Sequence, residues 1–397
     1  MTDEKDLTLD ELLVKEAETH DSHIQFLLCR YFENQKDYEN SFFWAQKSAD
    51  QNDGDGMARL GVHYLYGWNC EKDQDKCFEL AKKSAGLGSA WGNNLLGICY
   101  DEGRGTEKDI EQALKYYKLS AEAGNELAQR NLGNMYYYDE GVEQNFEEAL
   151  KWYKLAADQG DAVAQNNLGN MYYTGKGVQQ NYEEALKWYK LAAAKGKANA
   201  QCSIGCMYAN GEGVEQDFEE AFKWFKLAAD QGDADAQSNL GIMYYNSEGV
   251  EHNFEEALKC FKLAADQGHA DAQCRLGSMY YNGEGVEQNY QEAFKWYKLA
   301  ADQGHSFAQY AIGTMYDIGD GVEQDYEKAC HYYTLAADNG YASSQSNLGV
   351  LFYDGYLGKP DYKKAFKYFK LAAEQEESYA QFRLAELYYK GLELLKI

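Results

Sequence analysis

Hydrophobic and polar residues along this chain follow a helical period, and the whole pattern recurs every 36 residues. One glycine per repeat marks the register, and no insertion or deletion disturbs it. These glycines are Gly61, Gly97, Gly133, Gly169, Gly205, Gly241, Gly277, Gly313 and Gly349. A further step of 36 residues reaches Ala385 at one end and Gln25 at the other, so degenerate copies stand at both ends. Such a chain predicts one array of similar structural units.

Each repeat begins with a segment that has the spacing of an amphipathic helix. In the repeat over residues 161–196, the apolar residues Ala164, Leu168 and Met171 recur at i, i+4 and i+7, which places them on one face. Asp161 precedes them at the position of a helix N-cap. Glycines at positions 175 and 177 then interrupt the helical pattern, so we expect a loop there.

A second helical segment completes the repeat. Asn181 is followed three residues later by Glu184, which is the pattern of a reciprocal capping box. Small and aromatic positions such as Ala185 and Tyr189 share one face, and Gly196 stands where a left-handed residue ends a helix. Each repeat is therefore predicted to be a helical hairpin. Because one hairpin cannot bury both of its faces, the hairpins must stack on each other.

The repeat also resembles a known family. The run AQNNLGNMYY over 164–173, the loop GKGV over 175–178 and the run YEEALKWYKLAA over 182–193 are similar to the Sel1-like repeat, a relative of the tetratricopeptide repeat. The resemblance extends over about nine-tenths of the chain, in about ten copies. It implies an all-α fold, an α/α solenoid wound as a right-handed superhelix, with capping helices at the ends. Members of the family act as adaptors, which implies the same role here.

Three parts are expected along the chain. Residues 1–16 form an N-terminal tail and a short capping helix, residues 17–390 form the repeat array, and residues 391–397 form an apolar C-terminal tail. The apolar residues of the tail are Leu392, Leu394, Leu395 and Ile397. We expect a monomer, although this tail could either fold back as a cap or pair with a second molecule.

Charge narrows the range of partners. The chain carries 65 acidic and 38 basic side chains, for a net charge of −27. This excess argues against binding to nucleic acid and against docking on an anionic membrane. No apolar run has the length of a membrane span, and no secretory signal is visible. The cysteines are irregularly spaced, which is typical of a reducing compartment. We therefore expect a cytoplasmic protein, with delivery into a host cell left open.

Catalytic and metal-binding motifs are missing from the sequence. It contains no Gly-x-Ser-x-Gly, no phosphate-binding loop and no His-Glu-x-x-His. His269 and His305 stand at N-cap positions, and Cys202 and Cys206 lie one helical turn apart without a third ligand in register. The segment Asp53–Gly56 resembles the start of a calcium loop but lacks the glutamate at its twelfth position. We expect neither enzymatic activity nor a cofactor nor a metal.

The first helix of each hairpin has a second face that is rich in asparagine. Relative to the marking glycine, positions −6, −2, +1 and +5 lie opposite the core positions. First helices of tetratricopeptide-like solenoids line the concave groove, so asparagines here could hydrogen-bond the backbone of an extended peptide. The candidate peptide-groove residues are Asn131, Asn134, Asn167, Asn170, Asn239, Asn246, Asn282 and Asn347.

The asparagine-rich face and the acidic loops each have two possible interpretations. The asparagines either contact a peptide or are tolerated polar filler in a lysine- and asparagine-rich proteome. The acidic residues of the loops either provide solubility and favourable helix-dipole contacts or steer a basic partner. The function we favour is a non-enzymatic adaptor that binds a protein or peptide in its concave groove. The alternative is a regulatory or targeting subunit that activates or localises an enzyme or host factor.

Overall fold

The computed structural model describes residues 8–391, and this part of the chain is helical with no β-strand. It divides into two compact units, one up to Ala200 and one from Gln201 onwards, with the division inside helix α12. The helices of the first unit are α1 (Leu9–Thr19), α2 (Ser22–Asn34), α3 (Tyr38–Asp50), α4 (Gly54–Tyr66), α5 (Gln74–Gly86), α6 (Ala90–Glu102), α7 (Ile110–Glu122), α8 (Glu126–Tyr138), α9 (Phe146–Asp158), α10 (Ala162–Thr174) and α11 (Tyr182–Ala194).

Helix α12 (Ala198–Asn210) is followed by the helices of the second unit. These are α13 (Phe218–Ala229), α14 (Ala234–Asn246), α15 (Phe254–Asp266), α16 (Ala270–Asn282), α17 (Tyr290–Asp302), α18 (Ser306–Ile318), α19 (Tyr326–Asp338), α20 (Ala342–Asp354), α21 (Tyr362–Ala373) and α22 (Ser378–Tyr389). The all-α solenoid that the sequence predicted is confirmed.

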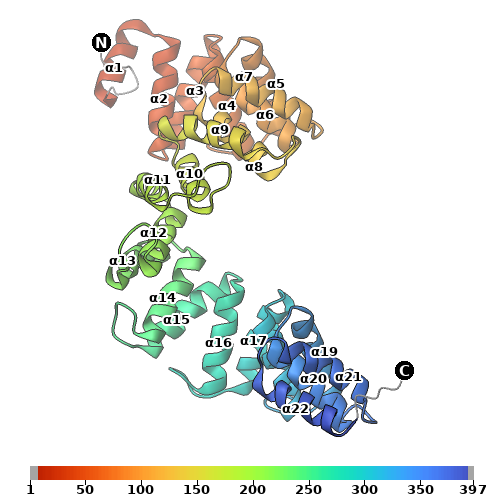
Figure 1. Cartoon of the computed structure of the whole chain (residues 1–397). Coiled ribbons are helices and arrows are strands. Elements are labelled where there is room, and N and C mark those ends of the chain that lie inside the picture. The colour runs from red at the N-terminus through yellow and green to blue at the C-terminus, as the bar shows by residue number, and fades with distance from the viewer. Residues whose placement is uncertain (1–7, 392–397) are drawn as a thin grey trace. The chain divides into compact units, whose positions relative to one another are not determined.

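Helical hairpins stack in chain order within each unit (Figure 1). The even-numbered helices from α2 onwards are called first helices here, and the odd-numbered helices from α3 onwards second helices. In the first unit, α2 pairs with α3 and α4 with α5, while α3 packs on α4 and α5 on α6. Successive first helices also contact one another, as in α2 with α4 and α4 with α6. The extra helix α1 packs on α2 and covers the start of the array.

The marking glycine allows an aromatic ring to lie against the first helix. A Cβ atom at Gly169 would lie 2.6 Å from the Tyr189 ring, which is closer than van der Waals contact permits. The loop glycine Gly177 has φ +72°, and a Cβ there would lie 2.5 Å from the carbonyl oxygen of Phe146. Glycine is therefore required at these two places for different reasons, close packing in the helix and a left-handed turn in the loop.

The apolar core passes from one hairpin to the next and does not gather at one centre. Tyr153 on α9 packs with Leu168 and Met171 on α10, and Trp188 on α11 covers the same cluster. Alanines such as Ala185 are fully buried at the helix contacts. A hairpin thus completes its core only with its neighbours, as the stacking argument requires.

The predicted capping boxes are only half correct. The Asn181 side chain accepts a hydrogen bond from the backbone N–H of Glu184 at 3.0 Å, as expected of an N-cap. The Glu184 carboxylate, however, accepts from Lys187 and does not return to the backbone of Asn181. The same exchange occurs at the Glu148, Glu220, Glu256 and Glu292 positions. A lysine three residues further along the helix offers a charged donor, which competes with the N-cap amide.

Buried glutamines provide a polar link between successive hairpins. On α14, the Gln237 amide nitrogen donates to the carbonyl of Ala229 at 3.3 Å. Its side-chain oxygen accepts from Gln267, at the end of α15, at 2.8 Å. The same 30-residue bridge joins Gln129 to Gln159, Gln201 to Gln231, Gln273 to Gln303, and Gln345 to Gln375. These bonds satisfy buried polar groups and fix the register of one hairpin on the next.

The structure describes part of each end of the chain, and α1 continues to Thr19, past the boundary expected at residue 16. Helix α1 follows an N-terminal segment, of which residues 1–7 lie outside the described part, and a capping box of Thr8 and Glu11 opens it. Residues 392–397 also lie outside the described part, so a dimer through the apolar tail stays a prediction. Between residues 8 and 391, no helix combines the length and the apolar character that crossing a membrane requires.

Candidate functional site

The first helices carry a pocket in each unit, on the face that the sequence assigned to positions −6, −2, +1 and +5. In the first unit, a pocket of about 190 Å³ lies over α2, α4, α6 and α8. Trp91 lines it from position −6, Arg59 and Asn131 from position −2, Ile98 from position +1 and Tyr66 from position +5. The remaining lining residues are Glu33, Ala58, Val62, Leu65, Trp68, Asn94, Leu95, Leu127 and Arg130.

Two arginines lie over one tryptophan in this pocket. The Arg59 guanidinium carbon is 4.0 Å from the centre of the Trp91 ring, and that of Arg30 is 4.6 Å from the same ring. Arg59 is only 8% exposed, and its Nη1 donates to the Glu33 carboxylate at 3.3 Å. Cation–π stacking and this ion pair hold the Arg59 side chain in one place.

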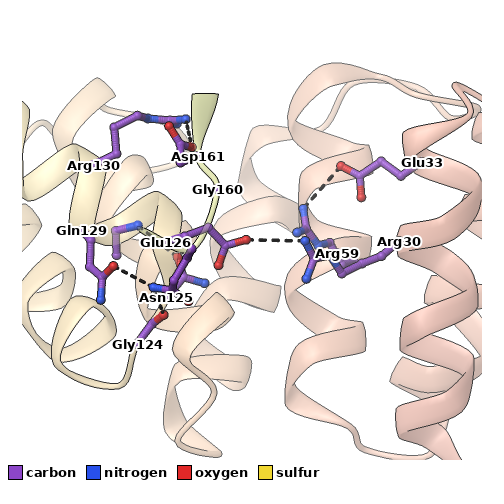
Figure 2. A network of polar contacts seen from close by, with 12 residues as sticks. Arg30, Glu33, Arg59, Gly124, Asn125, Glu126, Gln129, Arg130, Gly160 and Asp161 are labelled. Atoms are coloured by element: carbon purple, nitrogen blue, oxygen red, sulfur yellow. Dashed lines mark hydrogen bonds and ion pairs between the residues drawn. The ribbon is translucent and has the colours of Figure 1, made fainter. Parts of the chain in front are cut away.

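Acidic side chains from other helices and loops pair with the arginines (Figure 2). Glu126, at the start of α8, lies 3.5 Å from Arg30 on α2, although 96 residues separate them in sequence. Arg130 on α8 pairs with Asp161 at 2.8 Å. Burial lowers the pKa of Arg30, and the nearby positive charge of Arg59 lowers it further. A partly buried ion pair thus links the first helices α2 and α8 beside the pocket.

The second unit has an aromatic pocket of about 220 Å³ in the same register. Phe307 at position −6 is 39% exposed, and its ring lies 6.1 Å from Tyr310. Tyr341 from the next hairpin lies 5.2 Å from Tyr310. Asn282 and Thr314 supply polar groups at the edge. This arrangement suits apolar or aromatic side chains of a partner.

The predicted asparagines are spread between several environments. Asn131 donates to Asn94 at 3.2 Å, and Asn167 donates to Asn134 at 3.4 Å, so amides of successive first helices do meet. Asn239 lies 3.9 Å from the Cys206 sulfur. The last three differ, because Asn246 and Asn282 bond Glu248 and Glu284 in the loops and Asn347 lies beside Tyr333. Asn131 and Asn282 line the two pockets.

Several asparagines have a partner inside the hairpin that the sequence analysis missed. The Tyr153 hydroxyl donates to Asn134 at 2.7 Å, and the Tyr189 hydroxyl donates to Asn170 at 2.6 Å. Burial raises the pKa of the Tyr153 phenol, so the phenol stays protonated and donates. Where the second helix has phenylalanine instead, the residue 19 positions earlier is not an asparagine. These pairs are Phe225 with Cys206, Phe261 with Ile242, and Phe369 with Val350.

This pairing extends to other polar residues and has one exception. Tyr297 bonds Ser278 at 3.0 Å and Tyr333 bonds Thr314 at 3.2 Å, both across 19 residues. Tyr117 has Ile98 at that spacing, and its hydroxyl bonds Asp101 at 3.4 Å instead. The polar residue at position +1 therefore satisfies a buried phenol, which leaves its amide less available to a peptide.

The arginines and tryptophans of the first unit were also missed. The use of arginine in the sequence could have indicated this site. The chain has 32 lysines but only six arginines, and Arg30, Arg59 and Arg130 fall within its first four repeats. Arginine is the residue that forms planar, stacked contacts with carboxylates and rings, so its selective use marks a site. The spacing alone could not reveal that Arg30 and Glu126 meet.

Several side chains that the sequence analysis considered for chemistry have structural roles in the described residues. His269 and His305 cap α16 and α18 through their Nδ1 atoms, as predicted. Asp53 likewise caps α4 by accepting from Gly56 at 2.7 Å. Burial raises the pKa of the Cys29 thiol to about 11, which disfavours a reactive thiolate. Within residues 8–391, no three His, Cys, Asp or Glu side chains are grouped to hold a metal ion.

Comparison with known proteins agrees with this architecture. Eleven consecutive segments between residues 25 and 396 match the Sel1 repeat. The chain belongs to the Sel1 repeat family. The matched segments are 25–53, 54–89, 92–125, 127–161, 162–197, 198–233, 234–269, 270–305, 306–341, 342–377 and 378–396. The prediction of about ten Sel1-like repeats is confirmed, with one further copy.

Solved structures of Sel1 repeat proteins share the fold. A protective antigen of uropathogenic Escherichia coli strains is 33% identical, with a TM-score of 0.73 over 90% of this chain and 76% of the antigen. A Sel1 repeat protein from Oxalobacter formigenes is also 33% identical, with a TM-score of 0.61 over 78% of this chain and 90% of that protein. No curated protein sequence matches the chain closely enough to be called a relative.

Proposed function

We propose that this Sel1 repeat protein is a non-enzymatic adaptor that binds a protein partner on the face formed by its first helices. Sel1 repeat solenoids commonly serve as protein interaction scaffolds. The observation that carries the proposal is the pair of pockets on this face, which present Trp91 and Arg59 in one unit and Phe307 in the other. Tryptophan, tyrosine and arginine are the residues that dominate binding energy at protein interfaces.

The asparagines of the same face belong to the proposal as a secondary set of contacts. Asn131 and Asn282 line the pockets, whereas Asn134 and Asn170 are occupied by tyrosine hydroxyls. We therefore assign recognition chiefly to the aromatic and arginine side chains. The net charge of −27 favours basic partners at long range, because the acidic loops attract them before contact.

Affinity capture with matched variants tests the adaptor role. Phe307→Ser changes the pocket of the second unit, where the ring is 39% exposed. Leu263→Ser, on the second helix α15, removes a side chain that is 56% exposed and serves as the control. We expect a partner captured by the natural chain to be lost with Phe307→Ser or with Tyr66→Ala and kept with Leu263→Ser. Equal capture by every variant, with circular dichroism unchanged, would contradict binding on this face.

A further inference from the structure

Arg59 is buried, and not all of its N–H donors have an acceptor. A guanidinium group offers five N–H donors, and Glu33 is the acceptor that Arg59 Nη1 reaches, at 3.3 Å. Arg59 Nε is buried and has no hydrogen-bond acceptor among the residues that the structure describes. Burying a charged donor without an acceptor costs free energy, so Arg59 keeps hydrogen-bonding capacity that a ligand in the pocket can use.

The space beside Arg59 is small and largely apolar. Leu95, Ile98 and Leu127 line it together with Trp91, and the volume is about 190 Å³. Pockets that enclose small-molecule ligands and cofactors are typically larger, roughly 300–1,000 Å³. The size suits one or two side chains of an extended segment, and the lining suits an apolar one.

The three arginines at and around the pocket each pair with one carboxylate, Arg59 with Glu33, Arg130 with Asp161 and Arg30 with Glu126. Arg59 and Arg130 line the pocket, and Glu33 is the acidic residue among the lining side chains. Glu126 and Asp161 pair with Arg30 and Arg130 from outside the lining. With these pairs included the site has no net positive charge, so a ligand is held by the N–H donors that the arginines have left over. A monoanionic carboxylate meets less repulsion from Glu33 than a dianionic phosphate does.

We propose that this pocket binds a carboxylate that neighbours an apolar side chain in the partner protein. The proposal rests on the adaptor function and names the chemistry that one part of the groove recognises. The carboxylate accepts N–H groups from Arg59 and Arg130 in the forked geometry that arginine favours. The apolar side chain packs against Trp91, Leu95 and Ile98. Because the chain as a whole is acidic, this recognition depends on short-range, desolvated contacts and not on long-range attraction.

Arginine side-chain NMR tests the assignment directly on the full chain. The chain has six arginines, so selective ¹⁵N-arginine labelling gives six Nε–H resonances, which single substitutions assign. The probe is N-acetyl-leucine, which carries one carboxylate beside an apolar side chain. N-acetyl-leucine amide is the neutral control, inorganic phosphate is the dianionic control, and Arg104, which pairs with Glu102 on the surface, is the internal control.

We expect N-acetyl-leucine to shift the Arg59 and Arg130 resonances saturably, with a dissociation constant of about 1–10 mM. The amide should not shift them, and Arg104 should not respond. Arg59→Gln should weaken the saturable shift of Arg130 about tenfold or more, since a charged hydrogen bond is lost. Arg59→Lys, which keeps the charge but not the fork, should weaken it as well.

Three results would overturn the proposal. They are an Arg59 shift no larger than that of Arg104, equal shifts with the acid and the amide, or stronger binding of phosphate than of N-acetyl-leucine. A failure here is distinguishable from failure of the adaptor function. If N-acetyl-leucine does not bind but a captured partner is still lost with Phe307→Ser, the carboxylate site is wrong and the groove function stands.

Discussion

At the scale of single residues, the buried tyrosine hydroxyls of the second helices depend on an acceptor in the first helix of the same hairpin. Apart from Tyr117, whose hydroxyl bonds Asp101, the tyrosines considered above have a polar residue 19 positions earlier, as in Tyr189 with Asn170. Phenylalanine instead has Cys, Ile or Val there, as in Phe261 with Ile242. A buried phenol needs an acceptor, whereas a phenyl ring needs none. The two residues therefore change together unless another acceptor, such as Asp101 for Tyr117, is within reach.

We predict that Tyr189→Phe lowers the free energy of unfolding by about 1 kcal/mol, because the Asn170 amide loses its donor. Adding Asn170→Ile should recover most of this loss, since the double variant reproduces the Phe261 and Ile242 pair. Urea unfolding of the natural chain, both single variants and the double variant gives the coupling energy. Strictly additive effects would show that the two side chains do not depend on each other.

A second prediction for single residues concerns the cysteines, whose thiol reactivity should depend on burial and hydrogen bonding. Burial raises the pKa of Cys29 to about 11, while a hydrogen bond from Cys202 lowers the pKa of the half-buried Cys206. At pH 8 the Cys206 thiolate is therefore more populated than that of Cys29. We expect iodoacetamide to label Cys206 well before Cys29 in the native chain, as read by peptide mass spectrometry. Labelling in the reverse order would contradict the assigned environments.

At the scale of elements, the glutamine bridge joins hairpins and is missing where Gln165 stands. Gln165 on α10 donates to Ala157 at 3.1 Å, but its side-chain oxygen is buried with no donor among the described residues. The position that carries glutamine in other repeats is Lys195 here, and its ammonium group bonds the carbonyl of Gly160 instead. This contact is a weak point in the array.

We predict that Lys195→Gln raises the free energy of unfolding by about 1 kcal/mol, because it supplies the missing donor to Gln165. The matched opposite change, Gln267→Lys, should remove the 2.8 Å bond to Gln237 and lower stability by a similar amount. Urea midpoints at constant m-value measure both effects. A destabilised Lys195→Gln variant would mean that Gln165 is satisfied in another way.

Hairpins, loops and N-caps could be predicted from the sequence because each depends on residues close together in the chain. Asn181 as a cap and Gly177 as a left-handed residue are examples. The prediction of reciprocal capping boxes was wrong because Lys187 donates to the Glu184 carboxylate in place of the N-cap amide. The arginine site could not be predicted, since Arg30 and Glu126 lie 96 residues apart and their meeting depends on how four hairpins stack.

At the scale of the whole molecule, the net charge of −27 works against the compact state. The acidic loops and helix starts repel one another, and salt screens this repulsion. We predict that the unfolding temperature rises as sodium chloride increases from about 10 mM to about 150 mM. Differential scanning calorimetry measures it. A steady fall over this range would show that the ion pairs contribute more than the repulsion costs.

The central claim is that a protein partner binds on the first helices. Hydrogen–deuterium exchange of the chain, free and bound to a captured partner, tests this claim most directly. We predict slower exchange in the complex on first helices, including α4, α6 and α8 around Arg59 and Trp91, with second helices such as α5 and α7 unchanged. Protection confined to the second helices would contradict the claim.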